Sequence, residues 1–236
     1  MIFPFIALCF SWEYVNYTGY VDEDGKVTAK EGLLPDGDCW AEWSDTLNTT
    51  GWYHLTLRSH EGVENGKMGF CAGYLEGMLA HTRIYQSTML FFDQTNLKRT
   101  NHEGIYGYDR LVEWYGVHLS WMEHAIDSYP DSKYWRQVKV IHNLFKGLCK
   151  GYNDTVGFKS LDDPLPEQLT EMEMFIMVSM GDSLELLASW EWIPRNSEML
   201  QHCTGVIKMS PDQDDIYFAH DSWTDYRCLH AIAVKY

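Results

Sequence analysis

The chain has 236 residues, of which 45% are hydrophobic and 15% aromatic. That is enough apolar material for a packed core, so most of the chain is not intrinsically disordered. Eighteen Lys and Arg stand against 34 Asp and Glu, and the resulting net charge of −16 repels both nucleic acid and an anionic membrane surface. No run approaches the roughly 20 apolar residues of a transmembrane helix. Composition therefore predicts an acidic globular protein with no nucleic-acid partner and no transmembrane segment.

The chain begins with an apolar run, Ile2 to Phe10, followed by small residues around a cut before Trp12. This run has the length of the hydrophobic region of a signal peptide, although a basic stretch before it is missing. We expect residues 1–11 to be a signal peptide and the protein to be lysosomal or secreted. The alternative is a buried first strand. Three Asn-x-Thr sequons favour the secretory route. They place expected glycans on Asn16, Asn48 and Asn153.

The first half of the chain changes from loop-like to helical patterns. Residues 12–50 are polar and interrupted by Gly and Pro, which predicts loops and short strands. Alternating aromatic and polar residues predict a strand at Trp52–Leu57. Apolar residues at three- and four-residue spacings then predict three helices. They extend from Cys71 to Met89, from Tyr108 to Ile126 and from Trp135 to Leu148.

The third helix has its own start and stop signals. Asp131 is placed to cap it and Gly151 to end it. Residues 151–167 contain Gly, Asn, Asp and two Pro, which is typical of a linker. A fourth helix is predicted over residues 168–190 from its apolar spacing.

The fourth helix contains Gly181-Asp182-Ser183-Leu184, the motif of the GDSL hydrolases, in which Ser183 would be the nucleophile. That motif belongs just after an N-terminal strand and works with an Asp-x-x-His pair near the C-terminus. Here it lies in a helical pattern, and no such pair follows it. A GDSL-type serine hydrolase is therefore kept only as a minor alternative.

The pattern changes again after this helix. Cys203–Met209 and Asp215–His220 are rich in β-branched and aromatic residues, and a polar segment with a proline joins them. This predicts a β-hairpin at the end of a helical block. Asp212 and its acidic neighbours lack the Gly and the distal Glu of a calcium loop, so we interpret them as a solvated turn.

The six cysteines contain no Cys-x-x-Cys pair, and the ten histidines show no metal-binding spacing. We therefore expect no metal and no cofactor. Loss of Cys9 with a signal peptide would leave five cysteines, which permits two disulfides and one thiol without fixing their pairing.

The predicted hairpin resembles the phospholipase B-like (lamina-ancestor) family. Members show Cys-Ser/Thr-Ala/Gly, Ile/Val-Lys, Pro-Gly and Ala/Gly-His, with a Trp three residues after the His, and Cys203 to Trp223 is similar to that pattern. The resemblance covers about residues 50–236. Its upstream matches are Thr50–Tyr53, Ala72–Gly77, Tyr134–Gln137, Gly147–Tyr152 and the helix with Gly181-Asp182.

The resemblance implies an α+β fold, with an N-terminal helical block and the first strands of an N-terminal-nucleophile hydrolase αββα sandwich. It also implies self-cleavage between His202 and Cys203, which divides the chain into a mainly helical part, 12–202, and the start of the catalytic part, 203–236. Cys203 would then be the nucleophile, and its freed α-amino group, with a pKa near ~7.7–8.0 in general, would be the base. His220 matches the active-site histidine and would lie beside Cys203, with orientation and proton transfer both open as its role.

Family members continue for several hundred residues beyond this hairpin, so we expect a missing C-terminal catalytic part or a second chain as partner. The first functional hypothesis is a hydrolase of amide or ester acyl bonds, with a lipid or an N-acyl small molecule as substrate. The second is a non-catalytic glycoprotein of the same family that binds lipid or a partner through its helical block. The activity of the 236-residue chain by itself is left open by either hypothesis.

Overall fold

The computed structural model of the chain describes residues 14–95, 97, 106–156, 166–191, 203–222 and 232–235. It divides into two compact units, which we describe separately. The first comprises residues 1–81, 129–168 and 230–236, and the second comprises residues 82–128 and 169–229. The expected signal peptide and His202 lie outside the described residues. The boundary between these units does not coincide with the expected cleavage between His202 and Cys203, because residues 203–236 contribute to both units. The division into units therefore does not test the cleavage.

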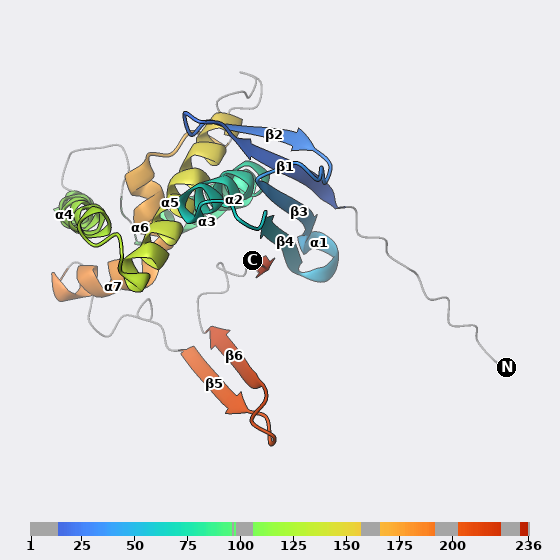
Figure 1. The fold of residues 1–236 in the computed structure, drawn as a ribbon. Coiled ribbons are helices and arrows are strands. Elements are labelled where there is room, and N and C mark those ends of the chain that lie inside the picture. Colours follow the sequence, from blue (N-terminus) through green and yellow to red (C-terminus); the bar gives the residue numbers. More distant parts are fainter. Residues whose placement is uncertain are drawn as a thin grey trace. The chain divides into compact units, whose positions relative to one another are not determined.

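A mixed sheet with strand order β2-β1-β3-β4-β7 organises the first unit (Figure 1). Strands β1 to β4 pair antiparallel with their neighbours, whereas β7 pairs parallel with β4. The strands are β1 Val15–Val21, β2 Val27–Glu31, β3 Cys39–Thr46, β4 Trp52–Ser59 and β7 Ile232–Lys235. The predicted strand at Trp52–Leu57 is confirmed as part of β4, and residues 12–50 hold more regular structure than the loops and short strands expected. The short helix α1, Leu47–Thr50, connects β3 to β4.

One face of this sheet is apolar because β3 and β4 alternate in phase. Ala41 pairs with Leu57, and Trp43 with Leu55, and all four side chains are buried. Successive residues of a strand point to opposite faces, so these side chains form one continuous layer. Helix α2, Asn65–Leu79, packs on the sheet.

Helix α5, Lys133–Val156, lies against α2 at a distance that only glycines permit. An added Cβ at Gly69, Gly73 or Gly77 of α2 would collide with the carbonyl oxygens of Val140, Leu144 and Leu148 in α5. In return, a Cβ at Gly147 or Gly151 of α5 would collide with the carbonyls of Phe70 and Tyr74. Later residues of α2 contact later residues of α5, since Gly69, Gly73 and Gly77 meet Val140, Leu144 and Leu148 in that order. The two helices therefore run parallel, backbone against backbone.

This contact corrects the prediction that Gly151 ends the third helix. The helix continues to Val156, because Gly151 lies where α2 approaches rather than at a C-terminal cap. Its capping residue is also one position later than predicted, since Ser132 Oγ, not Asp131, accepts from the amide of Trp135 at 3.4 Å. Part of the predicted linker, residues 151–156, is therefore helix.

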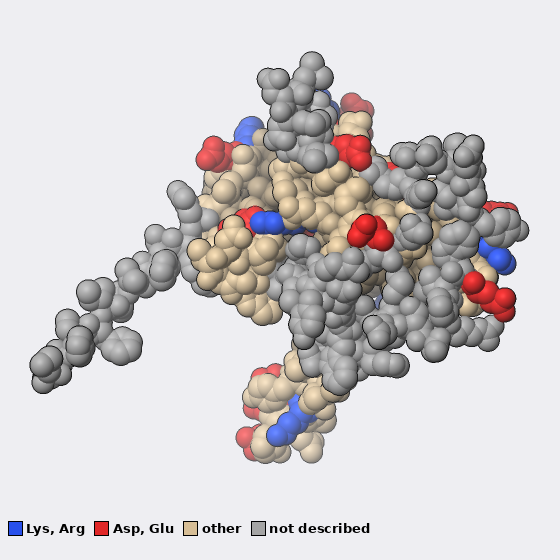
Figure 2. All heavy atoms as spheres, turned by 180° about the vertical axis from the view of Figure 1, so that it is seen from behind, with Lys and Arg blue, Asp and Glu red and all other residues tan. Residues whose placement is uncertain are grey.

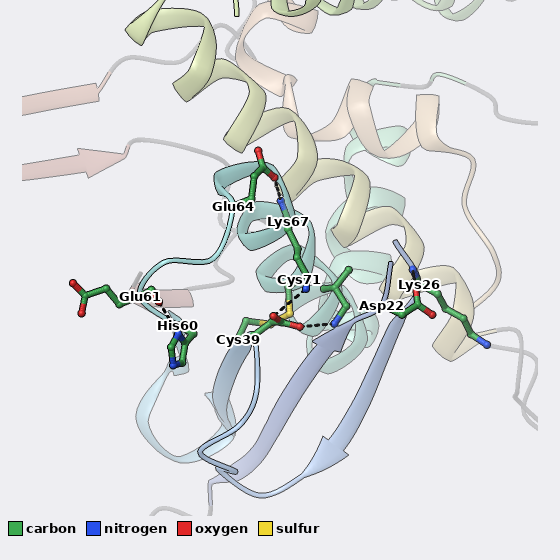
Figure 3. Close-up of polar contacts among 10 residues, drawn as sticks. Asp22, Lys26, Cys39, His60, Glu61, Glu64, Lys67 and Cys71 are labelled. Carbon is green, nitrogen blue, oxygen red and sulfur yellow. Dashed lines mark hydrogen bonds and ion pairs between the residues drawn. A yellow bond between two sulfur atoms is a disulfide. The ribbon is translucent and has the colours of Figure 1, made fainter. Parts of the chain in front are cut away.

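A disulfide between Cys39 and Cys71 joins β3 to α2 (Figure 3). Both cysteines are fully buried, and Gly19 on β1 provides the room, because a Cβ there would lie 2.7 Å from either sulfur. Beside the disulfide, Asp38 accepts from the amide of Val21 at 2.7 Å and lies 3.1 Å from Lys67 Nζ. The pairing, which sequence left open, thus fixes α2 to the middle of the sheet.

In the described part of the second unit, four helices share an apolar cluster. They are α3 His81–Thr95, of which His81 belongs to the first unit, α4 Tyr106–Ser128, α6 Glu171–Val178 and α7 Met180–Ser189. The cluster consists of Phe91, Phe92, Leu97, Leu111, Tyr115, Ile176, Leu184, Leu187 and Ala188. The predicted helix from Tyr108 to Ile126 is confirmed as α4.

Two predicted helices are each divided in two. The pattern from Cys71 to Met89 is broken at Ala80, where a ring nitrogen of His81 lies 2.8 Å from the Met78 carbonyl. The pattern over 168–190 is broken at Ser179, between α6 and α7. Apolar spacing continues across both breaks, so periodicity alone could not reveal them. Thr170 and Glu173 cap α6 reciprocally as a capping box.

The predicted hairpin is confirmed as β5 Cys203–Met209 paired with β6 Ile216–Ser222. Ile207 pairs with Phe218 and Met209 with Ile216, and these four side chains are mostly exposed. The predicted α+β class is therefore confirmed, whereas the αββα sandwich stays a prediction.

We expect Gly73→Ala to destabilise the protein by about 2 to 3 kcal/mol, because its methyl group must push α5 away from α2. Gly116→Ala on α4 is the matched control, since nothing lies within 4 Å of a Cβ at that helical position. The control should stabilise by about 0.5 to 1 kcal/mol. Urea unfolding measures both, and equal midpoints for the two variants would contradict the packing role of Gly73.

We also expect the 236-residue chain purified alone to aggregate or to require a partner, because β5 and β6 present apolar side chains and strand edges. Replacing Ile207 and Phe218 together by Thr should raise the soluble fraction severalfold, whereas Lys208→Thr should not. Size-exclusion chromatography distinguishes the outcomes. A monomer of the unaltered chain that unfolds cooperatively would show the prediction to be wrong.

Candidate functional site

The two predicted catalytic positions lie on opposite strands of the β5–β6 hairpin. Cys203 is the first residue of β5 and pairs with Ser222, and His220 of β6 pairs with Gly205. Directly paired residues, and residues two apart on one strand, share a face of a sheet. Positions 203 and 220 are therefore diagonal neighbours on one face of the hairpin. This register agrees with the expected proximity of Cys203 and His220, and it tests neither of their roles.

Apart from Ser222, which pairs with Cys203, the rest of this face of the hairpin consists of glycine and apolar residues. The pairs Ile207–Phe218 and Met209–Ile216 follow positions 203 and 220 along the strands at intervals of two. Ile207 and Phe218 are each more than four-fifths exposed, at 82% and 83%. A nucleophile at position 203 would consequently stand at the end of an apolar strip.

The alternative nucleophile, Ser183, is unavailable to a substrate. Its side chain is fully buried in the second unit, where its hydroxyl donates to the Ile176 carbonyl at 3.0 Å and lies 2.8 Å from the Tyr115 hydroxyl. Burial raises the pKa of Tyr115 although the Ser183 contact opposes it, so the phenol stays protonated and is no base at neutral pH. The Gly181-Asp182-Ser183-Leu184 string is therefore the start of a packed helix, and the GDSL alternative is wrong for this fold.

The upstream family-like motifs have a structural role. Ala72–Gly77 and Gly147–Tyr152 lie on α2 and α5, and their glycines form the close contact between the two helices. The first motif also contains Tyr74, whose hydroxyl donates to Asp154 at 3.2 Å. Lys150 Nζ also donates to Asp154 Oδ2 at 2.6 Å. Burial, followed by the charge and hydrogen bond of Asp154, raises the pKa of Tyr74 to about 12.

Sequence reasoning missed a groove beside this Tyr74–Asp154 pair. It has a volume of about 530 Å³ and is bounded by Val15, Tyr17, Ala29, Tyr74, Met78, Leu79, His81, Asp154 and Thr155. The Tyr74 hydroxyl donates a hydrogen bond to Asp154, and the Thr155 hydroxyl donates one to the Gly151 carbonyl at 2.8 Å. With the hydroxyls of Tyr74 and Thr155 engaged in this way, the groove is suited to packing or binding rather than to nucleophilic chemistry. No sequence signal marks it, because its walls come from five secondary-structure elements, β1, β2, α2, α3 and α5.

The three sequons lie in different environments. Asn48 is exposed in α1, whereas Asn153 is half-buried within helix α5 rather than in the predicted linker over residues 151–167. Asn16 lies in β1 with its Oδ1 buried, and the hydroxyl of its sequon partner Thr18 donates to the Gly32 carbonyl at 2.6 Å. Of these three, Asn48 is the position that the fold leaves open to a glycan.

The described part of the chain contains no group of three or more His, Cys, Asp or Glu arranged to hold a metal ion. The acidic turn after β5 is held by its own contacts, since Ser210 Oγ donates to Asp214 Oδ1 at 2.6 Å. None of the described helices has the length and hydropathy to cross a membrane.

Comparison with known proteins agrees with the resemblance seen in the hairpin. A family model described as phospholipase B matches residues 39–236. Phospholipase B-like protein A of Dictyostelium discoideum is 27% identical over 89% of this chain and 39% of its own length. Phospholipase-B 81 of Drysdalia coronoides is 25% identical over 88% of this chain and 38% of its own length.

A third relative, phospholipase B-like protein D of Dictyostelium discoideum, is 22% identical over 95% of this chain and 40% of its own length. The chain thus spans about two fifths of the length of these relatives. The family match covers well over half of the chain and includes the glycine contact, the disulfide and the hairpin. The chain belongs to the phospholipase B family.

Proposed function

We propose that this chain carries the nucleophile of a lipid hydrolase that cleaves amide or ester acyl bonds. Family membership supports the hydrolase class, and one structural observation supports the site. The β5–β6 register puts positions 203 and 220 on one face, at the end of the apolar strip formed by Ile207, Met209, Ile216 and Phe218. That strip offers an acyl chain an apolar wall beside the thiol.

The thiol becomes an N-terminal nucleophile by self-cleavage. Cys203 Sγ attacks the carbonyl carbon of His202, a C–S bond forms as the C–N bond breaks, and the departing nitrogen gains a proton. Water then opens the thioester, which leaves a carboxylate on His202 and a free α-amino group on Cys203. Such attack requires hydrogen-bond donors to the oxyanion and a constrained backbone at the bond.

Hydrolysis then uses one residue as nucleophile and base. The α-amino group accepts the thiol proton, the thiolate attacks the acyl carbonyl, and the ammonium group returns the proton to the departing alcohol or amine. Water releases the acyl group from sulfur in a second step. His220, a diagonal neighbour of position 203, orients the amine and the thiol.

A non-catalytic role in binding lipid or a partner is the second candidate. The observation that favours it is that the glycines of the motifs on α2 and α5 pack the two helices together, so these two motifs serve the fold rather than catalysis. The two functions differ in one measurable property, the appearance of a new N-terminus at Cys203.

In the full-length protein we expect two chains, the second beginning at Cys203, and Cys203→Ala should leave one uncleaved chain. His220→Gln should slow lipid hydrolysis by about tenfold or more while slowing cleavage less, because orientation matters at every turnover. Ser222→Ala is the matched control for His220→Gln, because Ser222 pairs with Cys203 and lies on the same face of the hairpin. N-terminal sequencing and release of fatty acid from phospholipids and N-acyl amides provide the readouts. An uncleaved wild-type protein at both acidic and neutral pH would reject Cys203 as the nucleophile.

We further propose that the protein is lysosomal or secreted. The buried disulfide between Cys39 and Cys71 supports an oxidising compartment, because such bonds are rare in the reducing cytosol. The exposed sequon at Asn48 supports the same route.

Protein made in its native host should carry a glycan on Asn48, which is accessible in α1. Asn48→Gln should therefore increase gel mobility by the amount that glycosidase treatment of the wild type produces. Asn153→Gln, at a half-buried helical position, should give little or no mobility change. A wild-type protein of unchanged mobility after glycosidase treatment would speak against the secretory route.

A further inference from the structure

The sheet of the first unit contains strands from both sides of the bond at which we propose cleavage. Strands β1 to β4 precede Cys203 and follow one another in sequence, whereas β7 comes from beyond that residue and pairs parallel with β4 (Figure 1). The division into units agrees, because residues 230–236 belong to the first unit together with residues 1–81 and 129–168. Cleavage between His202 and Cys203 would therefore cut the chain without cutting the sheet.

Strand β7 covers an edge of β4 that would otherwise be open. The register runs from the pair Tyr53–Ile232 to the pair Thr56–Lys235, and among the described strands β3 covers the opposite edge of β4. Tyr53 and Leu55 in this stretch are almost completely buried. A bare edge of such aromatic and aliphatic residues presents unpaired N–H and C=O groups that recruit other chains. The edge of β4 is therefore a docking site for a strand, and β7 is its occupant.

Neither net charge nor the disulfide joins the two sides of the cut. Residues 203–236 contain five Asp and three Lys or Arg, so they carry −2 of the total of −16 and residues 1–202 carry −14. Parts of like charge repel each other, and Asp and Glu lie at separate places over the face in Figure 2. The disulfide joins Cys39 to Cys71, which both precede the cut. Backbone pairing of β7 with β4, in contrast, needs neither opposite charge nor a covalent link.

We propose that β7 holds the two chains of the cleaved protein together, so that residues 12–202 stay as a permanent subunit and are not released as a propeptide. This inference rests on the proposed self-cleavage and concerns the fate of its products. The partner of the β4 edge is a strand of the second chain, which backbone hydrogen bonds recognise in parallel register. Because the same strand completes the sheet before and after cleavage, the bond can break while the first unit stays folded.

The first test isolates the cleaved full-length protein through an affinity tag at its C-terminus, in reducing buffer. The N-terminal chain should be recovered with the tagged chain. Replacing Ala233 and Val234 together by Pro should lower this recovery severalfold, because successive amides of a strand point to opposite edges and one of the two must face β4.

Replacing Thr28 and Ala29 together by Pro is the matched control. These residues lie in β2, the strand at the other end of the described sheet. They pair with β1, which is on the same side of the cut. The control should therefore disturb a terminal strand of the sheet to a similar extent and leave recovery of the N-terminal chain unchanged.

A second measurement does not require cleavage. In uncleaved full-length protein carrying Cys203→Ala, replacing Ala233 and Val234 by Pro should accelerate hydrogen exchange severalfold in the amides of Trp52–Ser59. The β2 control should instead accelerate exchange in Val15–Val21 and leave β4 unchanged. Equal exchange of α2 and α5 in all variants excludes general unfolding of the first unit.

Loss of the N-terminal chain from the cleaved wild-type protein would overturn the proposal. Full recovery of that chain in the β7 variant, or unchanged exchange of its β4 amides, would show that β7 is not the strand that holds the chains together. A wild-type protein that is never cleaved would reject the proposed function, on which the two-chain complex depends. Exchange of the β4 amides separately decides whether β7 occupies that edge.

Discussion

The backbone contact between α2 and α5 is the constraint on which the first unit depends. Five glycines, Gly69, Gly73, Gly77, Gly147 and Gly151, let carbonyl oxygens of each helix occupy the space of the other's missing side chains. Close approach of this kind replaces interdigitated side chains by extended van der Waals contact along both backbones. It also fixes the rotation of α2, because the glycine side can face only α5. The opposite side of α2 must then face the sheet, where Cys71 forms its disulfide and Leu75 is fully buried.

The fixed rotation explains how the polar residues of both helices meet. Tyr74 lies between Gly73 and Gly77 on α2, and Lys150 and Asp154 flank Gly151 on α5. Because the helices run parallel in a single register, Tyr74 reaches Asp154, and the carboxylate also accepts from Lys150. The raised pKa of Tyr74, about 12, follows from this enclosure and keeps the phenol a donor at every physiological pH. Motifs that resemble a hydrolase family therefore encode helix packing in this part of the chain.

Several elements were predictable because their signals are local. Alternation identified β4, three- and four-residue spacing identified α4, and the β-branched runs around Pro211 identified the β5–β6 hairpin. The errors arose where a residue served a distant contact. Glycine is common at helix C-termini, so Gly151 was predicted to end the helix. The close approach of the Tyr74 backbone from α2 explains why a glycine stands inside the helix instead. Likewise, nothing near Cys39 or Cys71 in sequence indicates that these two cysteines pair, since 32 residues separate them.

The candidate site was partly predictable for the same reason. A two-strand register follows from a short turn, so placing His220 near Cys203 needed only the hairpin between them. The groove beside Tyr74 required information that no short segment holds, namely which faces of the helices and of the sheet are already covered. Ser183 illustrates the opposite failure, because a matching string of four residues proved to be buried among Tyr115 and Ile176.

The scaffold and the chemistry are therefore separable in this chain. Glycine packing and the disulfide hold the first unit without using any group suited to acyl transfer, and the apolar cluster holds the second unit around a fully engaged serine. By contrast, the β5–β6 hairpin exposes Ile207 and Phe218, which its own two strands cannot bury. A strand that carries a nucleophile needs further elements packed against it, since oxyanion donors and an enclosed acyl site cannot come from two strands alone. The exposed apolar face of the hairpin is thus the surface on which further elements would have to pack to complete the site proposed for the family member as a whole.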